Sequence, residues 1–152
     1  MTSLGLVLDR FHMKRVCISS ESSMEPIIGF SRACRVGSLI AVAGTAAVDQ
    51  HGNTVHPGDV YAQTRFCLER SIAAIEQAGG QLEGIIRTRI LLRDIKHWQE
   101  AASAHGELFA VLKPACTFVE VSRFVNPEWL VETEMDCVIQ ADSSSTAIGS
   151  GL

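Results

Sequence analysis

The stretch Lys113-Pro-Ala-Cys-Thr-Phe-Val-Glu-Val-Ser-Arg123 contains the boundary on which the predicted order of elements depends. Pro114 lacks the amide hydrogen that a helix interior needs, so it closes the helix expected over His97–Leu112. The β-branched and apolar residues that follow predict a strand over Cys116–Ser122. This part of the chain is therefore expected to pass from a helix into a strand.

Five further strands are predicted from apolar and alternating runs: Arg15–Ser19, Ser31–Val36, Ser38–Thr45, Ile85–Leu92 and Leu130–Ile139. Another helix is expected to begin near Pro57 and Asp59, which suit a first turn, and to stop at Gly79-Gly80. The order is then three strands, a helix, a strand, a helix and two strands. This order predicts an α+β fold, with a six-stranded mixed sheet and two helices on one face.

Length and composition favour one working domain, because 152 residues with 47% hydrophobic side chains can bury a core. We expect this domain over 14–140, with a loose N-terminal extension over 1–13 and a flexible tail over 141–152. A net charge of −4 argues against nucleic acid as a partner, and the apolar runs are too short to cross a membrane. We also expect a cytoplasmic location, because no secretory signal is evident.

The cysteines and histidines do not form a metal-binding pattern. The five cysteines are widely spaced without a CxxC pair, and the histidines lack a suitable carboxylate pair, so we predict no metal. Four of the cysteines lie in apolar or alternating segments. There we expect reduced thiols packed as small buried side chains.

Two of the predicted strands alternate between an apolar and a charged face. The apolar faces are expected to hold Ile86, Thr88, Ile90 and Leu92, and Val131, Thr133, Met135, Cys137 and Ile139. The charged faces hold Arg87, Arg89, Leu91 and Arg93, and Glu132, Glu134 and Asp136. A basic and an acidic strand can neutralise each other within one sheet. Their charged faces are then either solvated or in contact with other subunits, where opposite charges set the register.

Several segments, in this order along the chain, resemble the RidA/YjgF family, which is also known by the older name L-PSP endoribonuclease. The segments are Gly29–Ala33, Val42–Gly44, the helix from Gln63 to Gly79, Ile85–Asp94, Lys113–Arg123 and Leu130–Glu134. The resemblance implies a chorismate-mutase-like fold, a homotrimer with a central barrel and three clefts between subunits. In RidA proper, each cleft hydrolyses enamines and imines such as 2-aminoacrylate without a cofactor. An arginine there holds the substrate carboxylate, and a glutamate positions or activates water.

The family pattern Pro-Ala-Arg-Ser-Cys-Val-Glu-Val corresponds to Pro114–Val121 in this chain. The resemblance implies that Glu120 is the catalytic glutamate, while Cys116 stands in place of the arginine and Phe118 in place of the cysteine. Strand parity puts these three residues on one face. With Phe30, at the position of a family tyrosine, and Gly44, they are the residues expected to form the pocket.

The loss of the arginine changes the expected substrate. A thiol cannot supply the bidentate, charged fork of a guanidinium, so ordinary 2-aminoacrylate deaminase activity is doubtful. Arg89 or Arg32 could bind the substrate in its place, or each could instead pair with Glu132 or Glu134. Cys116 is either a nucleophile, which would need a nearby base or cation, or a packed thiol.

Three functions follow from the resemblance. The first is a divergent, cofactor-free enamine or imine deaminase-like hydrolase with an altered substrate range at the inter-subunit clefts. The alternative is a non-catalytic homotrimer that binds a small molecule in the same clefts. The third, RNA cleavage, is disfavoured because a chain of net charge −4 is poorly equipped to hold phosphates.

Overall fold

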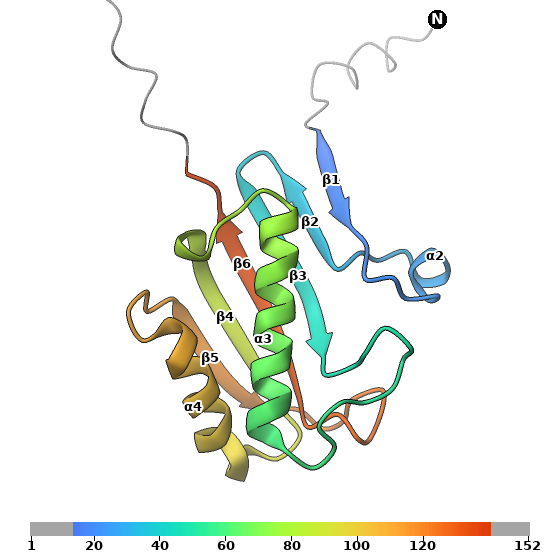
Figure 1. The fold of residues 1–152 in the computed structure, drawn as a ribbon, viewed down its shortest axis with the longest axis vertical. Coiled ribbons are helices and arrows are strands. Elements are labelled where there is room, and N and C mark those ends of the chain that lie inside the picture. The colour runs from blue at the N-terminus through green and yellow to red at the C-terminus, as the bar shows by residue number, and fades with distance from the viewer. Residues whose placement is uncertain (1–13, 141–152) are drawn as a thin grey trace, which may run out of the picture.

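A computed structural model describes residues 14–140, which form one six-stranded sheet with helices α3 and α4 packed against the same face (Figure 1). The strands are β1 (Arg15–Ile18), β2 (Ala33–Val36), β3 (Leu39–Ala46), β4 (Ile85–Leu92), β5 (Ala115–Glu120) and β6 (Val131–Val138). The order across the sheet is β1-β2-β3-β6-β4-β5, in which only β4 and β5 run parallel. The predicted α+β class and mixed sheet are confirmed, while the proposed extension 1–13 and tail 141–152 lie outside the described residues.

The two long helices occupy the predicted regions, with shifted ends. Helix α3 covers Val60–Gln77, and the side chain of Asp59 caps it by accepting from the Ala62 amide at 2.9 Å. Helix α4 covers Trp98–Phe109 and follows a short 3-10 turn over Ile95–His97. No helix within residues 14–140 is long and apolar enough to span a membrane.

A third helix, α2, was not predicted. It covers only Glu25–Ile28, has a proline as its second residue and ends at Gly29, whose φ of 80° is left-handed. Four residues are too few to produce a helical hydrophobic period. Its apolar side chains are exposed, with 75% of Ile27 and 64% of Ile28 accessible.

The charged faces of β4 and β6 pair as the parity argument predicted. Arg89 lies 2.9 Å from Glu134 and 3.5 Å from Asp136, and Arg87 lies 3.7 Å from Asp136. One expectation for β4 was wrong. The ladder shifts between Ile85 and Arg87, so Ile85 is buried while Ile86 is 52% exposed.

The expectation of mostly buried cysteines was also wrong. Cys67 and Cys137 are buried, but Cys17 and Cys116 are exposed and Cys34 is half-buried. The exposed pair lies on β1 and β5, the two edges of the sheet. An edge strand has a neighbour on one side only, so its apolar pattern overstates its burial.

A buried amide ties α3 to two loops. The fully buried Gln63 donates through Nε2 to the carbonyls of Val55, His56 and Glu128, each at 3.2 Å. Its Oε1 accepts from the Leu130 amide at 2.9 Å. Because Leu130 directly precedes β6, this side chain fixes where that strand begins.

We expect the Gln63→Met substitution to lower the free energy of unfolding by about 2 to 4 kcal/mol, because buried backbone groups lose their partners while the volume is kept. Chemical denaturation measures this loss. The exposed Gln77 of the same helix provides the control, and Gln77→Met should change stability by no more than about 0.5 kcal/mol. Equal effects of the two substitutions would contradict the role assigned to Gln63.

Candidate functional site

A cavity of about 500 Å³ opens at the end of β3 and β6, beside the loop that follows β3. We call it the Glu132 pocket. Its walls include Phe30, Arg32, Gly44, Arg70, Trp129 and Glu132. These residues come from β3, β6, α3, the segment between α2 and β2, and the loop before β6.

Glu132 is the carboxylate of this pocket, and the register of β6 explains why it is unpaired. Glu134 and Asp136 lie opposite Arg89 and Arg87 of β4, whereas Glu132 lies opposite Leu91. The half-buried Glu132 carboxylate has no hydrogen bond or ion pair within residues 14–140. Burial, and secondarily the charge of Glu134, raise its pKa, and Arg32 opposes the shift. A desolvated, unpaired carboxylate in a cleft is suited to general acid-base chemistry.

The main chain at Gly44 makes room for this carboxylate. A Cβ atom at Gly44 would lie 2.7 Å from Oε2 of Glu132, which is closer than real Cβ contacts allow. The ladder between β3 and β6 shifts between Val42 and Thr45, so the irregular part of β3 contains this glycine. Gly44 therefore acts as the surface against which Glu132 rests.

Two arginines give the pocket positive charge. Nη1 of Arg32 donates to the Gly44 carbonyl at 3.2 Å and to Oγ1 of Thr45 at 2.9 Å. Arg70 donates to the Val48 carbonyl. Burial and the neighbouring charge of Arg70 lower the pKa of Arg32. Holding two cations near each other favours an anionic group in the pocket.

Two buried donors of the wall residues are unsatisfied. Nε of Arg32 and Nε1 of Trp129 have no hydrogen-bond partner within the described part of the chain. Buried N–H groups are normally paired with protein or water, so these two unpaired donors cost stability in the wall of the pocket.

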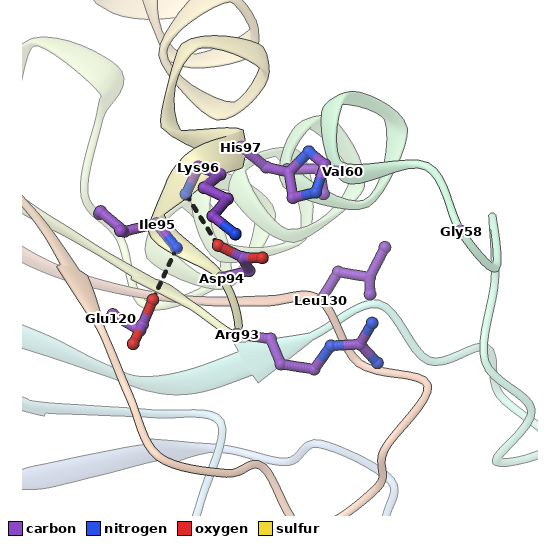
Figure 2. A pocket seen from close by; sticks show the side chains of 9 residues that line it. All are labelled: Gly58, Val60, Arg93, Asp94, Ile95, Lys96, His97, Glu120 and Leu130. Atoms are coloured by element: carbon purple, nitrogen blue, oxygen red, sulfur yellow. Dashed lines mark hydrogen bonds between the residues drawn. The ribbon is translucent and has the colours of Figure 1, made fainter.

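Glu120 lies elsewhere, in a cavity of about 560 Å³ at the end of β4 and β5 (Figure 2). Its Oε2 accepts from the backbone amide of Ile95 at 2.9 Å, which holds the 3-10 turn against the end of β5. Asp94 binds the Lys96 amide in the same turn at 3.0 Å. The Glu120 carboxylate is exposed, and its hydrogen bond gives it a structural partner.

The predicted site residues therefore fall into three places. Phe30, Arg32 and Gly44 meet in the Glu132 pocket. Cys116, Phe118 and Glu120 lie on the helix side of β5, opposite Thr88, Ile90 and Leu92 of β4. Arg89 points away from the helices and binds Glu134 and Asp136, so it has the ion-pair role that was its alternative. Strands β6 and β4 separate β3 from β5, so the first two groups do not meet within one chain.

From the sequence, Glu132 was considered only as an ion-pair partner. The sequence nevertheless contained an indication that one carboxylate of this strand is unpaired. The outward face of β6 carries three carboxylates, while the facing residues of β4 include two arginines and Leu91. One carboxylate must then lack a partner on that strand. Finding which one requires the register, which the alternation of a single strand does not reveal.

A sequence profile of the family described as Endoribonuclease L-PSP matches residues 20–139 of this chain. A RutC family protein of Pyrococcus abyssi is 32% identical over 122 residues, which are 80% of this chain and 95% of that protein. An uncharacterized protein of Streptomyces coelicolor is 33% identical over 120 residues, which are 78% and 88% of the two chains.

Solved structures agree with these sequence matches. A Mycobacterium tuberculosis member of the YjgF/YER057c/UK114 family superposes with a TM-score of 0.75 and 38% identity, over 83% of this chain and 100% of that one. The Escherichia coli YjgF product superposes with a TM-score of 0.70 and 25% identity, over 82% and 99%. The sequence match over most of the chain and the shared fold show that this chain belongs to the Endoribonuclease L-PSP family, the RidA/YjgF family that its motifs resemble.

Proposed function

We propose that this protein is a cofactor-free hydrolase of small imines or enamines, with the Glu132 pocket as its reaction site. The observation that carries the proposal is the Glu132 carboxylate itself, which is half-buried and unpaired within residues 14–140 and has a raised pKa. This assignment replaces Glu120 as the reacting acid, because the Glu120 carboxylate already binds the Ile95 amide. We place the protein in the cytoplasm, as expected from the sequence.

The proposed reaction needs one group that can take up and return a proton. Ionised Glu132 removes a proton from water as the oxygen attacks the imine carbon, and the π electron pair moves to nitrogen. The protonated carboxyl then gives its proton to the nitrogen of the carbinolamine. As that intermediate collapses, Glu132 passes the hydroxyl proton to the nitrogen, the C–N bond breaks, the carbonyl forms and ammonia leaves. A carboxyl with a raised pKa is suited to both steps near neutral pH.

The charges of the pocket favour a substrate that carries an anionic group. Arg32 and Arg70 place two cations in the wall, and Nε of Arg32 lacks a partner within the described residues. We propose that Arg32 takes the substrate-binding role that Cys116 cannot perform. The overall charge of −4 gives no comparable support to RNA as the substrate.

We further propose that the chain assembles as a homotrimer through the sheet face opposite α3 and α4 (Figure 1). That face leaves 61% of Leu39 and 38% of Val119 exposed, on either side of the ion pairs of β4 and β6. A sheet face that its own helices do not cover favours burial against another subunit. Assembly would also let the β5 side chains of one copy approach the Glu132 pocket of another.

A non-catalytic ligand-binding trimer remains the second candidate, because unsatisfied donors and two cations would also suit a protein that only binds. Ammonia release from imines distinguishes the two functions. A binder would show a rise in melting temperature with small organic acids and no ammonia release from any imine.

We expect Glu132→Gln to reduce ammonia release from freshly generated imines by about 100- to 10,000-fold, because an amide cannot take up the proton. The assay should include 2-aminoacrylate and bulkier imino acids. The matched control is Glu120→Gln, which should keep activity within about threefold, since a glutamine oxygen can still accept from the Ile95 amide and the proposed reaction gives Glu120 no proton to transfer. Loss of activity in the Glu120 variant alone would overturn the assignment in favour of the original prediction.

The pH dependence gives the Glu132 variant an independent check. Activity of the wild type should fall as pH falls through the raised pKa of Glu132, because the base becomes protonated. Above that pKa the ionised carboxylate destabilises the folded state, so Glu132→Gln should be at least as stable as the wild type at neutral pH. This advantage should vanish below the ordinary glutamate pKa, where the carboxyl is protonated in both states.

Gly44→Ala should abolish most activity while leaving the fold intact, because the new Cβ would displace the Glu132 carboxylate rather than a core side chain. We expect a loss of about 100-fold, measured with the same ammonia assay. Gly106→Ala is the control, since a Cβ there meets nothing within 4 Å. If Gly44→Ala kept full activity, Glu132 would not need its present position.

We expect Val119→Glu to dissociate the proposed trimer, because it places a charge on the sheet face that would be buried. Sedimentation equilibrium at micromolar concentration measures the mass. Val111 is 92% exposed and lies just after α4, away from that face, so Val111→Glu should assemble like the wild type. A monomeric wild type would refute the assembly and leave the Glu132 chemistry to be judged by activity alone.

A further inference from the structure

Three side chains from three elements form a linked cluster at the β5 edge of the sheet. Parallel pairing places Cys116 of β5 opposite Thr88 of β4. Oγ1 of Thr88 lies 2.9 Å from Nε2 of His105, which belongs to α4. Because the two residues face each other on the helix side of the sheet, the Cys116 side chain lies beside that of Thr88. The hydroxyl therefore connects a thiol to an imidazole, which the sequence alone had not placed beside Cys116.

In this cluster the thiol is accessible to solvent, whereas the hydroxyl and the imidazole are held in place by packing. Cys116 is exposed, because β5 ends the sheet, whereas Thr88 is fully buried. The half-buried His105 ring packs 4.7 Å from the ring of Phe109 and 6.1 Å from that of Phe118. These contacts hold the imidazole over the strand. A small molecule can thus reach the sulfur while the groups behind it stay fixed.

The protonation states suit transfer of a proton away from the thiol. Burial lowers the pKa of His105, so the ring is neutral at neutral pH and Nε2 can accept from Thr88. Partial burial of the sulfur raises the pKa of Cys116, while the neighbouring Thr88 side chain and the Thr117 backbone oppose that shift. No charged group of α4, β4 or β5 contributes to either shift. The resting thiol is protonated. The Thr117 amide can stabilise a thiolate as it forms, and Thr88 can do so once its own proton has passed to His105 and the thiol proton has reached it.

We propose that Cys116 is a nucleophile that adds to electron-poor C=N or C=C bonds of small molecules, with Thr88 and His105 taking its proton. The sulfur forms a bond to the electron-poor carbon, and the π pair moves to the far atom of the double bond. The thiol proton passes to Thr88 as the Thr88 proton passes to His105. The adduct then takes a proton from the imidazolium, so the addition is balanced without an oxidant or a leaving group.

The test of this proposal does not depend on the proposed hydrolase activity. The Cys116 site uses another strand and another face of the sheet, and its chemistry can be followed without an imine or ammonia release. Acrylamide is a suitable probe, since its terminal carbon accepts the sulfur and the proton ends on the carbon beside the carbonyl. Failure of the Glu132 experiments would leave this measurement unchanged, and the reverse also holds.

The experiment follows acrylamide adducts at Cys116 by site-resolved mass spectrometry. We expect Thr88→Val to slow the reaction about tenfold or more, because it keeps the shape and removes the connecting hydroxyl. Thr88→Ser retains a hydroxyl and should stay within about twofold of the wild type. Exposed Cys17, on β1 at the opposite edge, is the internal control and should react equally in all variants.

His105→Gln tests the base separately. The Cys116 rate divided by the Cys17 rate should fall in the wild type as acidification protonates His105, and this fall should disappear in the variant. The proposal is overturned if neither Thr88→Val nor His105→Gln slows Cys116 relative to Cys17. It is equally overturned if Thr88→Ser is as slow as Thr88→Val in proteins with wild-type circular dichroism, because packing and not the hydroxyl would then be responsible.

Discussion

The position of β6 between β3 and β4 is the constraint on which the candidate site depends. Its register sets two of its carboxylates opposite the arginines of β4 and leaves Glu132 opposite Leu91. A slip of one residue would turn all three carboxylates toward the helices, where burial of unpaired charge is costly. A slip of two residues would bring Glu132 opposite Arg89 and Glu134 opposite Arg87, and it would leave Asp136 as the carboxylate without an arginine. The apolar face excludes the first slip and the ion pairs oppose the second, so together they select which carboxylate stays unpaired.

The core also reaches the pocket through Gln63. Its hydrogen bonds to the Glu128 carbonyl and the Leu130 amide fix the backbone on both sides of Trp129. That indole lines the pocket, and Glu132 follows two residues after Leu130. The fully buried amide of Gln63 is thus explained by what it positions. Burying such a group would be unfavourable without these partners.

Sequence patterns predicted the elements and the charge pairing well, because both depend on spacing along the chain. They failed where the outcome depends on which strands become neighbours. The cysteines were expected to be mostly buried, but β1 and β5 are edges that expose Cys17 and Cys116, and Ile86 broke parity at a bulge. The family resemblance selected Glu120 by position in a motif, and the structure gives that carboxylate a backbone partner. The sequence shows that the outward face of β6 carries more carboxylates than the facing part of β4 carries arginines. Only the strand pairing shows that Glu132 is the carboxylate left without a partner.

The two candidate reactive groups share a structural cause, although they lie on opposite faces of the sheet. Glu132 stands where the arginines of β4 end, and Cys116 stands where the sheet itself ends. In both places the sheet holds the residue on one side, and no neighbouring residue pairs with it on the other. A group in such a position has no fixed partner on one side, which costs stability but leaves its chemistry available. The regular centre of the sheet, with its paired charges and closed core, supplies the stability that lets both positions remain incomplete.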